Sequence, residues 1–417
     1  MATSKINYTV TNGNLFSAIA GEDHISSLLF DVSKDLAGSD STADGEIYNI
    51  FSLEEAEDLG IDGIIDPDAP TGAEYENGVV HKHISDFFAI NPNGELYIGL
   101  ADMSTNFNFL TTVQTVAQGR LRQQGIYTSQ ELFTAGTPYT VNHTAAIEAI
   151  ANADALNNRP YSVVLHANVA TVSSGAVDVD IAQIPSAIGN ESRVSVTIGQ
   201  GNDSLTNAVQ NAHSTKATVG AVGAMIALVS RASVHESIGW ISKFNLASVI
   251  TTISFGFGGV LTDITDNTPY ESLSSPQIDS LDTKGYIFPH KYVGYVGTYA
   301  SSEVTLSSGD YRTIARNRAI DKSRRVVRAS LLPTIQQPLY VDPATGSLSA
   351  GTIAQYKTII HQQLQVMQAN GEMSGFSITI DPTQDVLTTD TVAVKYRLIP
   401  VGVAKQINIE IGLSRSI

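Results

Sequence analysis

Residues 145–166 read AAIEAIANADALNNRPYSVVLH, and this stretch decides the fold class. Residues 145–156 are rich in alanine, the best helix former, and predict a helix. Residues 161–166 are apolar and contain two adjacent valines, which is typical of a buried strand. A helix followed by a buried strand is the repeating unit of proteins that combine helices with a parallel or mixed sheet.

The same alternation extends in both directions along the chain. Ser52-Leu53-Glu54-Glu55 is a capping box that opens a helix, and Gly60 stands where that helix should end. Further strands are expected at residues 26–31, 95–100, 194–199 and 246–257, and further helices at 107–119 and 217–230. The fold class is therefore mixed α/β (α+β), with sheets flanked by helices.

Two longer helices and two strands are expected toward the C-terminus. One helix, at 314–332, has its apolar residues on one face and ends at Pro333. The opposite face is basic and consists of Arg318, Lys322, Arg324, Arg325 and Arg328. A second helix begins at a Thr352…Gln355 capping box and ends at Gly371, before alternating strands at 376–380 and 392–398.

Both terminal regions are expected to form extended strand arms. After Pro400 and Gly402, apolar residues alternate with small or polar ones, which is the pattern of an amphipathic strand. The apolar positions of this C-terminal strand are Ile407, Ile409, Ile411 and Leu413. The N-terminal counterpart is shorter, with Ile6, Tyr8 and Val10 on one face and a turn at residues 11–14. An unpaired strand of this kind invites pairing with the sheet edge of another chain.

Composition narrows the classes of function. The 417 residues are 42% hydrophobic and only 16% charged, which fits a subunit that buries much of its surface against copies of itself. The net charge of −17 argues against binding along a nucleic-acid backbone. The chain has no cysteine, which excludes disulfides, thiolate metal sites and cysteine nucleophiles. We also expect no secretory signal and no membrane-spanning helix.

No motif in the sequence completes a catalytic or metal site. His81-Lys82-His83 lacks a third ligand, and a pair on the surface is the simpler interpretation. The acids at 62, 66 and 68 lack the spacing of a calcium loop. Residues 199–201 and 256–259 hold only fragments of a dinucleotide-binding loop. Residues 233–236 contain catalytic residue types that cannot converge from one short segment. Trp240 is expected to be a core or interface aromatic. We therefore expect no enzyme activity, no cofactor and no metal.

The order of several short motifs resembles that of a known family. The stretches run Gly285-Tyr286-Ile287-Phe288, 294–299 (GYVGTY), 310–311 (DY), 317–322 (NRAIDK) with Arg325, 367–375 (MQANGEMSG) and 399–407 (IPVGVAKQI). Residues 237–240 and 12–15 add to the likeness, which is clearest from about residue 282 onward. The chain resembles contractile phage tail sheath proteins, in particular the sheath-like family of Bacteroidetes prophages and related contractile injection systems.

That resemblance implies a structural subunit of a contractile tail. Such subunits polymerise as stacked hexameric rings around an inner tube, exchange terminal strands with their neighbours, and contract to drive the tube through a target envelope. The implied partners are further copies of the chain, the tube protein, and baseplate and tail terminator proteins, without nucleic acid or membrane insertion. The implied location is the tail of a virion or injection particle assembled in the bacterial host cytoplasm.

The resemblance also divides the chain into parts. The expected parts are an N-terminal arm (1–20), an acidic outward-facing α/β domain (21–118), a second α/β part packed with it (119–285), a tube-facing C-terminal domain (286–400) and a C-terminal arm (401–417). Segment 21–76 holds 16 acidic residues against one lysine, so the basic face at 318–328 has two possible acidic partners: the tube, or this segment of another subunit. An α/β enzyme with an unrecognised site and a tail component other than the sheath remain the alternatives.

Overall fold

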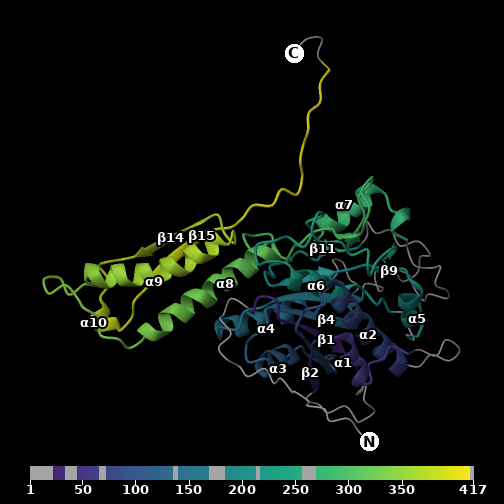
Figure 1. Ribbon diagram of the computed structural model, residues 1–417, viewed down its shortest axis with the longest axis horizontal. Helices are drawn as coiled ribbons and strands as arrows, with labels where there is room; N and C mark the ends of the chain where they lie inside the picture. Colours follow the sequence, from purple (N-terminus) through teal and green to yellow (C-terminus); the bar gives the residue numbers. More distant parts are fainter. Residues whose placement is uncertain are drawn as a thin grey trace, which may run out of the picture.

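A mixed sheet organises the larger part of the molecule (Figure 1). The computed structural model describes residues 22–32, 45–64, 72–134, 140–168, 184–212, 217–255 and 269–413. Over these residues the sheet has seven strands in the order β11-β8-β7-β4-β1-β3-β2. Their bounds are β1 Ser26–Asp31, β2 Glu46–Ile50, β3 Leu96–Ala101, β4 Gln123–Glu131, β7 Ser162–Asn168, β8 Val194–Thr197 and β11 Tyr286–Ile287. All neighbours pair in parallel except β2, which runs antiparallel to β3.

Helices cover both faces of this sheet, as a parallel sheet requires. One face carries α6 (Val222–Arg231), against which α2 (Gly72–Ile90) and then α5 (Ser204–Ala212) pack. The other carries α3 (Phe109–Val116) and α4 (Thr144–Leu156). Adjacent residues of β1 point to opposite faces of the sheet. Leu28 lies with α6 beside Gly125, whereas Leu29 lies with α3 beside Gly99. Every residue of α6 except Arg231 is buried.

Shorter elements complete this larger lobe. They are α1 Leu53–Asp58, β5 Phe133–Thr134, β6 Thr140–Val141, β9 Gln200–Gly201, β10 Ile253–Ser254, η5 Tyr270–Ser272, α7 Ser275–Thr283, β12 Pro289–His290 and β13 Tyr299–Ala300. One hydrophobic core contains residues from Ile25 to Ile314. It draws on the segments before and after residue 118, where a boundary between two parts is expected. The expected acidic part and the second α/β part thus contribute strands to one sheet and side chains to one core.

A smaller lobe follows, and it projects from one side of the larger one (Figure 1). Its elements are α8 Ile314–Leu331, η6 Leu332–Thr334, α9 Ala350–Ala369, β14 Gly375–Ile380, α10 Val386–Thr389 and β15 Val394–Ile399. The antiparallel β14–β15 hairpin packs its apolar face on α8 and α9, around Ile360 and Leu364. A third small core forms near Ile380 and Leu348.

Most of the expected elements are confirmed, with end points shifted by a few residues. Ser52 caps α1 by accepting the Glu55 amide at 3.3 Å, and Gly60 follows with a positive φ of 87°. Helix α9 begins earlier than predicted because its cap is Ser349, which accepts the Thr352 amide at 3.2 Å. The strand expected at 246–257 is wrong over most of its described length. Only Ile253–Ser254 is extended there, and Leu246 and Ile250 are buried from a series of turns.

Helix α2 was not predicted, since its sequence mixes charged and apolar residues. No helix in the described ranges is long and apolar enough to cross a bilayer.

Candidate functional site: the α8 joint and the C-terminal arm

Helix α8 joins the two lobes. Its first residue, Ile314, belongs to the core of the larger lobe, and Val327 belongs to the core of the smaller one. Thr313 caps the helix by accepting the Arg316 amide at 3.3 Å. Glu303 accepts the Ala315 amide at 3.2 Å, and burial raises the pKa of its carboxyl to about 7 against the lowering effect of that hydrogen bond. Any change in the angle between the lobes must pass through this helix.

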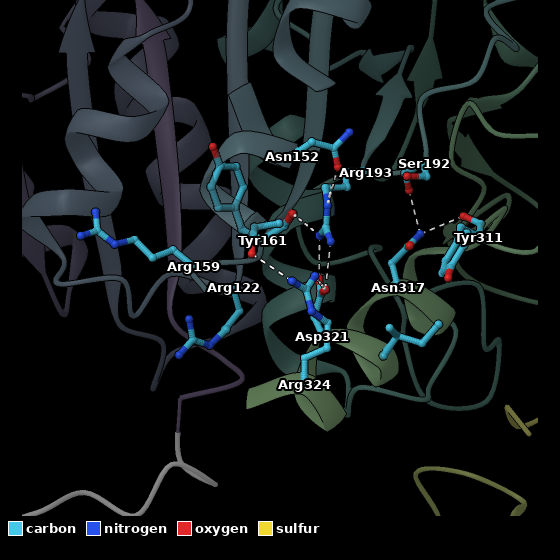
Figure 2. Close-up of polar contacts among 12 residues, drawn as sticks. Arg122, Asn152, Arg159, Tyr161, Ser192, Arg193, Tyr311, Asn317, Asp321 and Arg324 are labelled. Atoms are coloured by element: carbon cyan, nitrogen blue, oxygen red, sulfur yellow. Dashed lines mark hydrogen bonds and ion pairs between the residues drawn. The ribbon is translucent and has the colours of Figure 1, made fainter. Parts of the chain in front are cut away.

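A buried ion pair fixes the middle of α8 to the larger lobe (Figure 2). Arg193, directly before β8, holds both carboxylate oxygens of Asp321 at 2.7 and 3.0 Å. The guanidinium also donates to the Tyr161 carbonyl at 3.2 Å and to Asn152 at 3.1 Å. Burial acts to lower the pKa of Arg193, but the hydrogen bond and charge of Asp321, together with Glu148 and Tyr161, raise it overall. The bidentate geometry fixes orientation as well as distance.

Asp23 forms a second connection, which reaches α8 from the beginning of the larger lobe. Its carbonyl accepts a hydrogen bond from Arg318 at 3.0 Å. Its carboxylate pairs with Lys322 at 2.7 Å and also with Arg325. Lys322 reaches Glu372 of the smaller lobe at 2.5 Å, so one ammonium group bridges the two lobes. Burial lowers the pKa of Arg318 to about 10, which leaves it charged near neutral pH.

These contacts correct the expectation of a continuous exposed basic face. Arg318 and Lys322 are buried against the chain's own charges and carbonyl groups, and the side chain of Arg325 is only 10% exposed. The acidic partner does come from segment 21–76, but from the same chain, because Asp23 lies in it. The pattern alone did not reveal this, since buried and solvated charges have the same periodicity.

Arg324 and Arg328 remain accessible at the edge of the joint. The side chain of Arg324 is 38% exposed and donates to the Ala155 carbonyl at 3.0 Å. Arg328 is exposed. With Arg122 and Arg325, these two line a hollow of about 210 Å³ beside Glu22. Two of the five predicted basic residues are thus accessible to a partner, although Arg324 also contacts Ala155 and Asp321 of the joint.

The C-terminal arm, residues 401–417, is described as far as residue 413 and has no helix or strand there. It runs away from the body of the molecule (Figure 1). Ile407, Ile409, Ile411 and Leu413 are 80%, 77%, 87% and 105% exposed, respectively. The predicted strand thus has no ladder partner within the described chain. The N-terminal positions Ile6, Tyr8 and Val10 lie outside the described residues.

The base of the C-terminal arm is held on the larger lobe. Lys405 pairs with both carboxylate oxygens of Asp282, on α7, at 2.6 and 2.7 Å. Residues 401–404 line a groove of about 860 Å³ that also contains Trp240 and Tyr295, which are 49% and 53% exposed. Trp240 is therefore a surface aromatic in a groove. The arm follows directly on β15, which ends at Ile399, and Lys405 holds it on the larger lobe a few residues later.

The hairpin itself has unused edges. Within the part of the chain that the structure describes, β14 pairs only with β15 and β15 only with β14. Their inner face carries partly buried apolar side chains such as Ile378 and Tyr396. The outer face alternates with it and presents Lys395 and Arg397 to solvent. An unpaired sheet edge of this kind can accept an added strand.

The candidate chemical sites have structural roles. His83 is buried and bonds the Val219 carbonyl at 3.0 Å, and Lys82 pairs with Asp86 at 2.6 Å, so the expected surface pair at 81–83 is wrong for His83. Glu236 bonds Lys243 and the Ser233 amide. In the described ranges no three His, Asp or Glu side chains are close enough to bind a metal ion. Asp66, Asp68 and residues 256–259 fall outside those ranges.

Comparisons with known proteins agree with this architecture. Family models match over nearly the whole chain: "DUF2586, N-terminal domain" at residues 5–303 and "DUF2586, C-terminal domain" at 310–417. The boundary between them falls just before α8. No curated protein sequence matches the chain.

Several solved structures share the fold, among them the following three. The contracted helical sheath of the anti-feeding prophage has a TM-score of 0.57 and 14% identity, with 99% of each chain covered. The contracted sheath complex of the PVC extracellular contractile injection system has a TM-score of 0.57 and 13% identity, with 100% of this chain and 99% of that chain covered. A chain of the anti-feeding prophage baseplate has a TM-score of 0.55 and 12% identity, with 99% and 100% covered.

Proposed function

This chain belongs to the DUF2586 family, and from that membership and its fold we propose that it is the sheath subunit of a contractile tail or injection particle. The observation that carries the proposal is an end-to-end likeness in fold to two contracted sheath chains. In this role the protein is structural and has no active site. It stacks in hexameric rings around an inner tube and meets a baseplate at one end and a terminator protein at the other.

Two features support strand exchange between subunits: the C-terminal arm has no ladder partner in the described chain, and the β14–β15 hairpin has unpaired outer edges. The arm offers four apolar side chains that its own chain leaves exposed, and β15 offers a sheet edge. Residues 406–413 can extend over about 25 Å, which is enough to reach an adjoining subunit from an anchor at Lys405. Added strands gain main-chain hydrogen bonds and pockets for alternate side chains. The N-terminal arm is proposed to act in the same way.

Contraction changes the packing between subunits while the exchanged strands remain joined. We place the two-state element at the surfaces between subunits, and not within a subunit, because Arg193, Lys322 and Asp23 tie α8 rigidly to both lobes. Each subunit then moves as one body, and the arms act as tethers. The assignments of the acidic part to the outside and of the smaller lobe to the tube side belong to the same proposal.

Electron microscopy of the purified protein, alone and co-expressed with its tube protein, tests the proposed function. The expected result is helical tubes or stacked six-fold rings. Discrete monomers under both conditions, from a protein with a cooperative thermal transition, would rule out the sheath function.

Reversing the accessible arginines should weaken assembly on the tube. In Arg324→Glu combined with Arg328→Glu, we expect sheath formation around the tube to need about tenfold more subunit, equivalent to ~1.4 kcal/mol. The reason is that like charges would then face an acidic partner surface. Co-sedimentation with tubes measures the effect. Lys357→Glu on the exposed face of α9 is a control for a single charge reversal, and an unchanged thermal transition shows that the joint is intact. Equal sedimentation of the two variants would remove these arginines from the contact.

A further inference from the structure

The apolar face of the C-terminal arm does not determine its own register. Residues 407, 409 and 411 are all isoleucine, so sliding the arm by two residues puts an identical side chain in nearly every pocket. A slip of one residue is prevented, because it would turn the apolar face to solvent. A slip of two residues, about 6.6–6.8 Å, changes little in hydrophobic burial. Another feature must distinguish these registers.

The polar face of the arm contains one charge that can do so. Between residues 406 and 413 the even positions are Gln406, Asn408, Glu410 and Gly412, and Glu410 is the only charged residue of the segment. When the isoleucines of a bound arm face α9, the even residues lie on the outer face of the enlarged sheet. On that face the acceptor strand β15 presents Lys395 and Arg397, both exposed. The charges of the arm and of the acceptor edge are therefore complementary.

Arg397 is the better partner of the two basic residues. Hydrogen bonds from Thr383 lower the pKa of Asp381, and Lys395 nearby adds to that effect, so Lys395 already has an acidic neighbour. Over the described ranges Arg397 makes no side-chain hydrogen bond or ion pair. Its guanidinium can also hold a carboxylate with two parallel hydrogen bonds, which a lysine cannot.

We propose that Glu410 of one subunit pairs with Arg397 of a second copy of this chain, with the arm antiparallel to β15, and that this pair selects the register of the exchanged strand. The proposal rests on the proposed function, because it requires that the arm bind in trans. Antiparallel pairing is chosen as the more stable ladder per residue. In this register Asn408 lies beside Ile399, and a two-residue slip that puts Glu410 beside Lys395 brings Gln406 there instead.

Disulfide trapping can report the register directly, because the chain contains no cysteine of its own. Ile399→Cys, on the exposed face of β15, is combined with a single cysteine at position 406, 408 or 412. A disulfide requires Cα atoms about 4.4–6.8 Å apart, so a slip of two residues changes which pair can form. We expect the pair with Asn408→Cys to dominate in assembled protein. Dominance of the Gln406 or Gly412 pair would overturn the assignment.

Charge removal tests whether the ion pair causes the selection. In Glu410→Gln or Arg397→Gln, the yield of the 408 pair relative to the 406 pair should fall about two- to fivefold, as expected for a cross-strand ion pair. Lys395→Gln is the control and should not lower that ratio. An unchanged ratio in Glu410→Gln would overturn the proposal while leaving strand exchange intact. A protein that is folded and assembled but gives no interchain disulfide with any of these pairs would overturn the antiparallel pairing on β15, whereas strand exchange itself is tested separately by removal of residues 406–417.

Discussion

Removal of residues 406–417 is expected to abolish polymer formation and to leave the folded body unchanged. The four apolar side chains concerned are 77–105% exposed in the single chain, so their loss removes no packing from the described core. In a bound arm they would contribute roughly 6–12 kcal/mol gross, at about 1.5–3 kcal/mol for each buried side chain. Ordering and association costs reduce that sum, but the remainder is enough to decide whether a polymer forms.

The measurement is electron microscopy and sedimentation of the truncated protein, together with its thermal transition. The midpoint of that transition should lie within about 2 °C of the full-length monomer, because the apolar side chains at 407, 409, 411 and 413 are exposed in the single chain. Ile407→Ser with Ile409→Ser and Ile411→Ser should reproduce the defect, since it removes only the apolar face. Gln406→Ala with Asn408→Ala, on the polar face, should still polymerise. Normal polymers from the truncated chain would show that the arm is not the tether.

Asp321→Ala should produce the largest loss of stability among single substitutions at the joint. It would leave the buried guanidinium of Arg193 without its bidentate partner, and breaking a buried pair in this way costs about 3–5 kcal/mol. Arg324 would also lose an acidic neighbour 3.8 Å away. Because Asp321 lies between the cores that α8 joins, we expect the smaller lobe to lose its fixed orientation as well.

Urea denaturation followed by circular dichroism measures this loss. Lys291→Ala, which breaks the exposed pair with Glu271, is the matched control and should change the unfolding free energy by less than about 1 kcal/mol. Replacing both partners, as Arg193→Met with Asp321→Leu, should be milder than Asp321→Ala alone, because no unpaired charge is left buried. A loss below about 1 kcal/mol in Asp321→Ala would show that the pair does not hold the joint.

Local sequence patterns identified much of the fold because they reflect local causes. The capping residue Ser52, the alanine-rich helix α4 and the strand β7 depend on side chains within a few residues of one another. The prediction of a strand at 246–257 failed because the structure there depends on distant contacts. Leu246 and Ile250 are as apolar as strand residues, but they are buried from turns, and periodicity cannot distinguish these two ways of filling a core.

The candidate site was only partly accessible to the same reasoning. The alternation of residues 407–413 gave the amphipathic arm and its apolar face directly. The basic face of α8 was recognised as a pattern, but its surroundings were not. Arg325 lies 302 residues from Asp23, and Arg193 lies 128 residues from Asp321. No spacing rule connects residues so distant in sequence, and a charged side chain is assigned to solvent unless its partner is known.

The sequence by itself determined the α/β class and an arm with one apolar face, because helix and strand periodicities arise within a single segment. Only the tertiary structure decided which charges hold the molecule together and which remain available. It buries Arg318 and Lys322 and largely covers Arg325 against Asp23 and its neighbours, and it leaves Arg324 and Arg328 accessible. It also holds the base of the arm on the larger lobe through Lys405 and Asp282, on α7. The physical reason is that desolvation and pairing depend on what surrounds a side chain in space, which the order of residues does not state.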